Sequence, residues 1–191
     1  MSRPPSRPSG SGAVQAGWGN AANAFTLLRV ALVPVIVVLL LVGGDAARWW
    51  AFGVFLFAAF TDFFDGWLAR RLVGPTRWGA LADPAADKLL IIGLLAVLAL
   101  LGEVPWWAVA VVVVREAAVT AERSWLARRD VVMPASVFGK WKTVTQIAAV
   151  ALFLMPAAPP TVETVVLWIA VAATVASGLE YAFRGRRLLR G

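Results

Sequence analysis

Four aspartates lie in the first half of the chain at spacings that suit metal chemistry. Asp62 and Asp65 are three residues apart, and Asp83 and Asp87 are four apart. Residues at these separations share one face of a helix, so each pair presents two carboxylates in one direction. Four converging carboxylates would repel one another in a medium of low dielectric constant unless cations lie between them. The pattern predicts a site for divalent cations that prefer oxygen ligands, namely Mg²⁺, Mn²⁺ or Ca²⁺.

A site of two such metals suits in-line displacement at phosphorus, because it clamps both the entering and the leaving oxygen. The chain contains no His and no Cys, which excludes imidazole bases, thiolate nucleophiles, disulfides and zinc sites built from these residues. An alternative interpretation is that the aspartates cap helices or pair with neighbouring cations. That interpretation suits one aspartate better than four, because ionisable groups within membrane spans are usually functional. The neighbouring cations are Arg70, Arg71, Arg77 and Lys88.

The elements that carry these residues are long apolar segments. Hydrophobic residues make up 60% of the 191 residues and charged residues only 15%, against about 45–50% and about 25% in soluble domains. Six segments are each long enough for a helix to cross a hydrocarbon core of ~30 Å. They cover residues 24–43, 48–71, 82–101, 104–127, 138–156 and 162–183. We therefore expect an all-α integral membrane protein with six transmembrane helices, preceded by a short interfacial helix near residues 15–20.

The ends of the chain differ in composition from its middle. Residues 1–12 are rich in Pro, Ser and Gly, which is typical of a disordered tail. We expect one six-helix domain over residues 13–183 and a basic tail over residues 184–191.

The net charge of +7 comes from short basic clusters between the apolar segments, and this placement argues against a nucleic-acid partner. If the six segments alternate in direction, every Lys and Arg except Arg48 falls on one side of the membrane. The positive-inside rule then places both termini, and the aspartates, on the cytoplasmic side of the cell membrane.

The aspartate region resembles the signature of the CDP-alcohol phosphotransferases. The match is Asp-x-x-Asp-Gly-x-x-Ala-Arg, eight residues, then Gly-x-x-x-Asp-x-x-x-Asp, which here spans residues 62–87. The resemblance implies a homodimer of six-helix subunits among membrane lipids, with CDP-diacylglycerol as donor and CMP as leaving group. It also implies a divalent metal cofactor, Mg²⁺ or Mn²⁺, with two ions in each site.

The same resemblance assigns roles to individual residues. Asp62, Asp65 and Asp83 would be metal ligands, and Asp87 would be both a ligand and the general base for the acceptor hydroxyl. The nucleotide would be bound around the motif. The residues expected there are Gly66, Ala69, Arg70, Gly79 and Thr26.

Three further stretches resemble the bacterial phosphatidylglycerophosphate synthases of this family and imply sn-glycerol 3-phosphate as acceptor. They begin at Asn23, Arg115 and Phe138. The dianionic phosphate of that acceptor requires fixed cations, and Arg grips phosphate well by its forked geometry. The residues expected in this acceptor-phosphate site are Arg115, Arg123, Lys140, Lys142 and Thr120.

Other interpretations of these cations stay open. Lys140 and Lys142 would also suit anchoring at the membrane surface, and Arg115 could pair with Glu116 or Glu122.

The function expected is transfer of a phosphatidyl group from CDP-diacylglycerol to sn-glycerol 3-phosphate, which gives phosphatidylglycerophosphate and CMP. A phosphatidylinositol phosphate synthase or a cardiolipin synthase of the same family would differ only in the acceptor. A small ion transporter is the alternative from another class. Against it, the aspartates cluster at one membrane face instead of lining a path through the bilayer.

Overall fold

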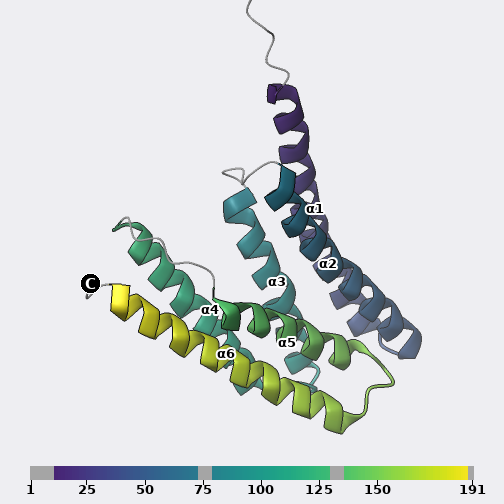
Figure 1. Ribbon diagram of the computed structural model, residues 1–191. Coiled ribbons are helices and arrows are strands. Elements are labelled where there is room, and N and C mark those ends of the chain that lie inside the picture. Colours follow the sequence, from purple (N-terminus) through teal and green to yellow (C-terminus); the bar gives the residue numbers. More distant parts are fainter. Residues whose placement is uncertain (1–10, 73–78, 130–135, 189–191) are drawn as a thin grey trace, which may run out of the picture.

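The chain folds into a bundle of helices in the computed structural model (Figure 1). The structure describes the backbone of residues 11–72, 79–129 and 136–188, and the side chains of residues 27–61, 88–126, 128–129 and 136–187. Over these ranges there are six helices and no strands, which confirms the all-helical class. The helices are α1 (Ser11–Val42), α2 (Asp45–Leu72), α3 (Gly79–Leu100), α4 (Trp106–Ala127), α5 (Val137–Leu154) and α6 (Pro160–Leu188).

Two helices extend further than the apolar segments suggested. α1 begins at Ser11 and runs unbroken through residues 15–20, so the interfacial helix expected there is part of α1 and not a separate element. α6 continues to Leu188, so residues 184–188 of the expected basic tail belong to a helix.

Length and composition make two helices within the described residues able to cross a membrane, Val137–Leu154 and Pro160–Arg187. Shorter apolar stretches occur in α1, at Leu27–Val42, and in α3, at Lys88–Leu100. Large apolar side chains are also exposed on all six helices, among them Leu41 and Phe60. Such a surface suits lipid better than water. The chain is therefore consistent with a membrane protein.

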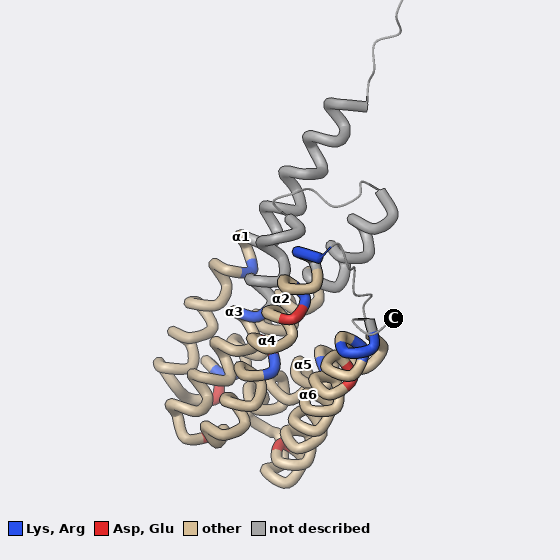
Figure 2. The backbone as a smooth tube through the Cα atoms, turned by 90° about the vertical axis from the view of Figure 1, so that its left-hand side faces the viewer, with Lys and Arg blue, Asp and Glu red and all other residues tan. Residues whose placement is uncertain are grey.

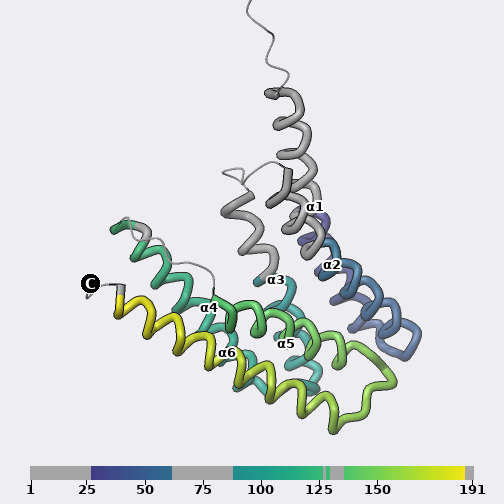
Figure 3. The backbone as a smooth tube through the Cα atoms, in the orientation of Figure 1, coloured from purple at the N-terminus to yellow at the C-terminus, as the bar shows by residue number. Residues whose placement is uncertain are grey.

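α3 forms the centre of the bundle. It packs against α1, α4 and α5, while α1 pairs with α2, and α6 pairs with both α4 and α5. Figure 3 shows α3 between the α1–α2 pair and the other three helices. Leu90, Leu94 and Leu98 of α3 are buried at intervals of four residues, which is the spacing that presents one face of a helix to its neighbours.

One end of the bundle is built from tight turns. Gly43, Gly44 and Gly102 end α1 and α3 with φ values of 74°, 84° and 80°, a conformation that side chains with a Cβ rarely adopt. At the same end, Arg48 pairs with Glu103, so the two turns are tied together. Figure 2 shows most of the described Lys and Arg positions away from this end, in the half of the bundle where α4 and α6 finish.

Candidate functional site

The four aspartates lie on two consecutive helices. Asp62 and Asp65 are on α2, and Asp83 and Asp87 are on α3. Both helices run unbroken through these positions, so the spacings of three and four residues do place each pair on one face. A donor set of four carboxylates would fit Mg²⁺ or Mn²⁺.

Their side chains lie outside those that the structure describes, so convergence of the two pairs stays a prediction. The residues expected at the nucleotide also lie outside the described side chains. These are Gly66, Ala69, Arg70, Gly79 and Thr26.

A buried carboxylate, Glu116 of α4, gathers cations from three helices. Lys142 of α5 donates from Nζ to Glu116 Oε1 at 2.6 Å, and Arg115 donates from Nη1 to the same oxygen at 2.8 Å. Lys88 Nζ of α3 lies 3.8 Å from Glu116 Oε2. We call Glu116, Arg115, Lys142 and Lys88 the glutamate-centred cluster. One negative charge faces three positive charges, so the cluster carries a net charge of two positive.

The charged side chains of this cluster are largely buried, which strengthens their electrostatic interactions. The side chains of Glu116, Arg115 and Lys142 are each only 10% exposed, and Lys88 is 31% exposed. Charges in such surroundings are poorly screened by water and require partners. Glu116 can satisfy only part of this requirement, so the cluster is suited to receive a further anion.

The helical period of α5 explains why Lys142 belongs to the cluster. Lys142, Gln146, Ala149 and Phe153 are buried along one face of α5, and this face packs inward. Lys140 is exposed on α5, as is Trp141. The structure thus separates two lysines that the sequence treats alike. Lys142 lies in the glutamate-centred cluster, whereas Lys140 has the exposure expected of a surface anchor.

Lys88 connects the cluster to the aspartate motif. It follows Asp87 directly in α3, and its ammonium donates a hydrogen bond to the Thr120 hydroxyl of α4. Thr120 therefore reaches the cluster through Lys88. In the sequence, Lys88 suggests only an ion-pair partner for the aspartates, because nothing local indicates that it faces α4.

Residues of α6 complete the surroundings of Arg115. Arg115 Nη2 donates to the Ser177 hydroxyl, and the guanidinium carbon lies 5.5 Å from the centroid of the Tyr181 ring. Arg123, also expected in the acceptor site, has its guanidinium carbon 5.8 Å from the same centroid. Ser177 and Tyr181 are missing from the residues predicted by sequence. The signal available for them was a row of polar residues at spacings of three or four in α6, which also contains Thr174 and Glu180.

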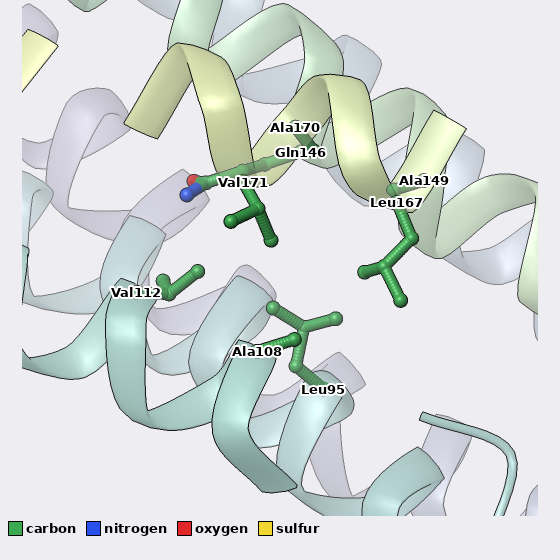
Figure 4. A pocket seen from close by; sticks show the side chains of 8 residues that line it. All are labelled: Leu95, Ala108, Val112, Gln146, Ala149, Leu167, Ala170 and Val171. Atoms are coloured by element: carbon green, nitrogen blue, oxygen red, sulfur yellow. The ribbon is translucent and has the colours of Figure 1, made fainter. Parts of the chain in front are cut away.

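A second polar pair lies next to the cluster, toward the bundle core. Gln146 Nε2 donates to Thr174 Oγ1 at 2.9 Å, and beside Gln146 lies a cavity of about 10 Å³, which is about the volume that one water centre needs. The other lining residues are apolar, as Figure 4 shows for Leu95, Val112 and Val171. Gln146, one helical turn from Lys142 on α5, therefore lies where the polar cluster gives way to the apolar core.

Comparison with known proteins gives a family match over most of the chain. Residues 19–176 match the family model described as CDP-alcohol phosphatidyltransferase, a range that includes the aspartates and the whole glutamate-centred cluster. The chain is 42% identical over 177 residues to a Mycobacterium tuberculosis (strain CDC 1551 / Oshkosh) protein named "Probable phosphatidylglycerophosphate synthase", covering 90% of this chain and 84% of that protein.

Two further relatives carry the name "CDP-diacylglycerol--glycerol-3-phosphate 3-phosphatidyltransferase". The chain is 36% identical over 179 residues to the one from Bacillus subtilis (strain 168), covering 85% of this chain and 93% of the relative. It is 32% identical over 168 residues to the one from Rickettsia bellii (strain RML369-C), again covering 85% and 93%.

Proposed function

Because the chain belongs to the CDP-alcohol phosphatidyltransferase family, we propose that it transfers the phosphatidyl group of CDP-diacylglycerol to sn-glycerol 3-phosphate. The products are phosphatidylglycerophosphate and CMP, and the chain is a transferase of phospholipid biosynthesis. The names of its relatives in Bacillus subtilis and Rickettsia bellii state this donor and this acceptor.

The net charge of the glutamate-centred cluster favours an acceptor that carries a phosphate monoester. A phosphate monoester has two negative charges near neutral pH, and the cluster has two uncompensated positive charges. Charge-assisted hydrogen bonds from Arg115, Lys142 and Lys88 would hold such a group firmly. The glycerol head group of phosphatidylglycerol lacks a monoester phosphate, so a cardiolipin synthase would leave these charges unused. Inositol phosphate fits the charge equally well, and the names of the relatives favour glycerol 3-phosphate over it.

In this proposal the four aspartates bind the metal ions, and one of them also accepts a proton. Asp62, Asp65, Asp83 and Asp87 would hold Mg²⁺ or Mn²⁺, two ions in each site, and the ions would supply electrostatic stabilisation of the transferred group. The acceptor hydroxyl oxygen forms a bond to the phosphatidyl phosphorus, the bond to CMP breaks, and CMP leaves with the electron pair. Asp87 accepts the hydroxyl proton. Lys88 follows Asp87, so a phosphate bound by the cluster is anchored beside the residue to which we assign the proton transfer.

Further residues are assigned to the nucleotide, and Thr120 is assigned to the acceptor. Arg70 binds the phosphates of the donor, with Gly66, Ala69, Gly79 and Thr26 around the nucleotide. Thr120 orients Lys88 through their hydrogen bond.

In the membrane, the proposal has six crossings, with both termini and the site on the cytoplasmic side, and two subunits in a dimer. The positive-inside rule supports this orientation, because Arg48 is the one basic residue on the opposite side. The exposed apolar side chains on all six helices also support six crossings.

Release of CMP by the purified protein tests the proposal. The protein in detergent is given CDP-diacylglycerol, Mg²⁺ or Mn²⁺, and one acceptor at a time: glycerol 3-phosphate, inositol phosphate or phosphatidylglycerol. We expect fast turnover with glycerol 3-phosphate alone. Asp62→Asn and Asp87→Asn should abolish it, whereas Asp45→Asn, at the exposed start of α2, should retain it. Turnover with inositol phosphate alone would refute the acceptor, and no CMP from any acceptor would refute the reaction.

A further inference from the structure

One aromatic ring contacts two arginines of the proposed acceptor site. The guanidinium carbons of Arg115 and Arg123 lie 5.5 and 5.8 Å from the centroid of the Tyr181 ring, within the range of cation–π attraction. We propose that Tyr181 is a positioning residue, whose ring holds both guanidinium groups in place for an anionic acceptor and so sets the affinity for that acceptor. This inference rests on the proposed function, because it takes these arginines as the acceptor site.

The ring itself is held firmly. Tyr181 is only 5% exposed and packs with Val119 and Leu126 of α4. Its hydroxyl accepts a hydrogen bond from the backbone N–H of Ser136 at 3.4 Å, immediately before α5. Contacts with α4 and with the start of α5 therefore fix the ring in two directions. A guanidinium group that packs against a fixed ring has fewer conformations open to it than a guanidinium group without such a contact.

A neutral ring has an advantage over a carboxylate in this place. The ring attracts cations through its quadrupole, so it holds them without cancelling their charge. Arg123 has no ion pair with any carboxylate among the described residues. In Arg115, the buried Nε has no hydrogen-bond partner within the same part of the chain. Both arginines thus keep attraction for an incoming anion.

α4 alone does not bring these arginines together. They are eight residues apart, which is about 12 Å along a helix axis. The contact they share is the Tyr181 ring of α6, which lies within cation–π range of both guanidinium carbons. Tyr181 also falls beyond residue 176, where the family match ends. The arginines and the aspartates therefore come from the matched segment, whereas the residue that positions the arginines comes from outside it.

Two small residues of α6 also help to position the Arg115 side chain. A Cβ added at Gly178 would lie 3.2 Å from Arg115 Cγ, so the stem of this arginine passes close to α6 where a side chain is missing. Ser177 next to it accepts from Arg115 Nη2. Both residues flank the approach of Arg115 to the Tyr181 ring.

Kinetics of three variants of the full chain in detergent test the proposal. Tyr181→Leu removes the ring, and Tyr181→Phe keeps it. With Tyr181→Leu we expect the KM for glycerol 3-phosphate to rise about 10-fold, since loss of one cation–π contact changes affinity by roughly 2- to 30-fold. The KM for CDP-diacylglycerol should stay the same, and Tyr181→Phe should stay within about 3-fold of the wild type for both substrates. Phe153→Leu, which removes a buried ring of α5 from the core, is the matched control and should lower the Tm but not change the KM for glycerol 3-phosphate.

A purely structural role for Tyr181 predicts a different pattern. Equal changes in both KM values, or a Tyr181→Phe variant as impaired as Tyr181→Leu, would overturn the proposal. If Tyr181→Leu does not fold, Arg123→Gln provides the test at an exposed position. It should raise the KM for glycerol 3-phosphate about 3-fold or more, and an unchanged KM would overturn the proposal.

The failure of the proposed function is distinguishable from the failure of this inference. If the wild type uses another phosphate-bearing alcohol, the proposed acceptor is wrong, and the same KM comparison is made with that alcohol. If no alcohol releases CMP, binding of labelled glycerol 3-phosphate to the wild type and to Tyr181→Leu is measured by equilibrium dialysis. Weaker binding to the variant supports the role of Tyr181, and equal binding or no binding refutes it.

Discussion

Neutralising Glu116 shows how strongly one carboxylate joins three helices. Glu116→Gln preserves the shape of the side chain but leaves Lys142 and Arg115, at 2.6 and 2.8 Å, without their counter-ion. Removal of one partner from a buried ion pair costs about 3–5 kcal/mol of stability. Because two buried cations lose their partner here, we expect a loss of about 4 kcal/mol in the free energy of unfolding.

Lys142→Met should cost much less. Glu116 keeps Arg115 at 2.8 Å and Lys88 at 3.8 Å, so no unpaired charge is left in the core, and we expect about 1–2 kcal/mol. In the double variant, Glu116→Gln no longer strands the Lys142 ammonium. The double variant should therefore lose about 2 kcal/mol less than the sum of the two single variants, within the usual range for contacting residues.

Unfolding of the four proteins in mixed detergent and dodecyl sulfate micelles measures this coupling. The control cycle uses Glu180→Gln and Arg184→Met, a pair at 2.5 Å that is more exposed on α6 and should couple by only about 0.3–0.5 kcal/mol. A coupling between Glu116 and Lys142 no larger than that of the control would refute the reasoning. The KM for glycerol 3-phosphate provides a second measurement. Lys142→Met should raise it roughly 10- to 100-fold, the equivalent of one charged hydrogen bond.

Two further variants separate stability from substrate binding. Ser136→Ala removes the α5 cap, in which Ser136 Oγ accepts a hydrogen bond from the Gly139 N–H at 2.9 Å. The free energy of unfolding should fall by about 1 kcal/mol, which is measured as a lower Tm. An unchanged Tm would show that the cap does not stabilise the protein. Arg48→Met breaks the pair with Glu103 and the hydrogen bond to the Phe153 carbonyl at 3.5 Å. It should cost about 1 kcal/mol with no change in either KM, because these contacts lie at the opposite end of the bundle, and a higher KM for glycerol 3-phosphate would contradict that separation.

The helices could be predicted well from sequence because their signals are local. Apolar segments of sufficient length end at residues such as Gly43, Gly44 and Gly102, and the observed turns occur there with positive φ. The family could also be predicted from the sequence, because the aspartate motif is defined by spacing along two consecutive helices. The start of α1 at Ser11 was not predicted, since the polar and small residues before the first apolar segment have no helical period of hydrophobicity.

The sequence by itself determined the helical class, the order of the apolar segments and the family. It also supplied the basic residues that are candidates for an anion site. The tertiary structure decided which of these cations meet. It placed Lys142 against Glu116 and left Lys140 exposed, joined Lys88 to the same carboxylate, and brought Ser177 and Tyr181 of α6 to Arg115. Spacing along one helix determines which residues share a face. Which faces meet depends on packing between helices, and here the contacts join residues 26 and 62 positions apart, a separation at which no local pattern in the sequence indicates the partner.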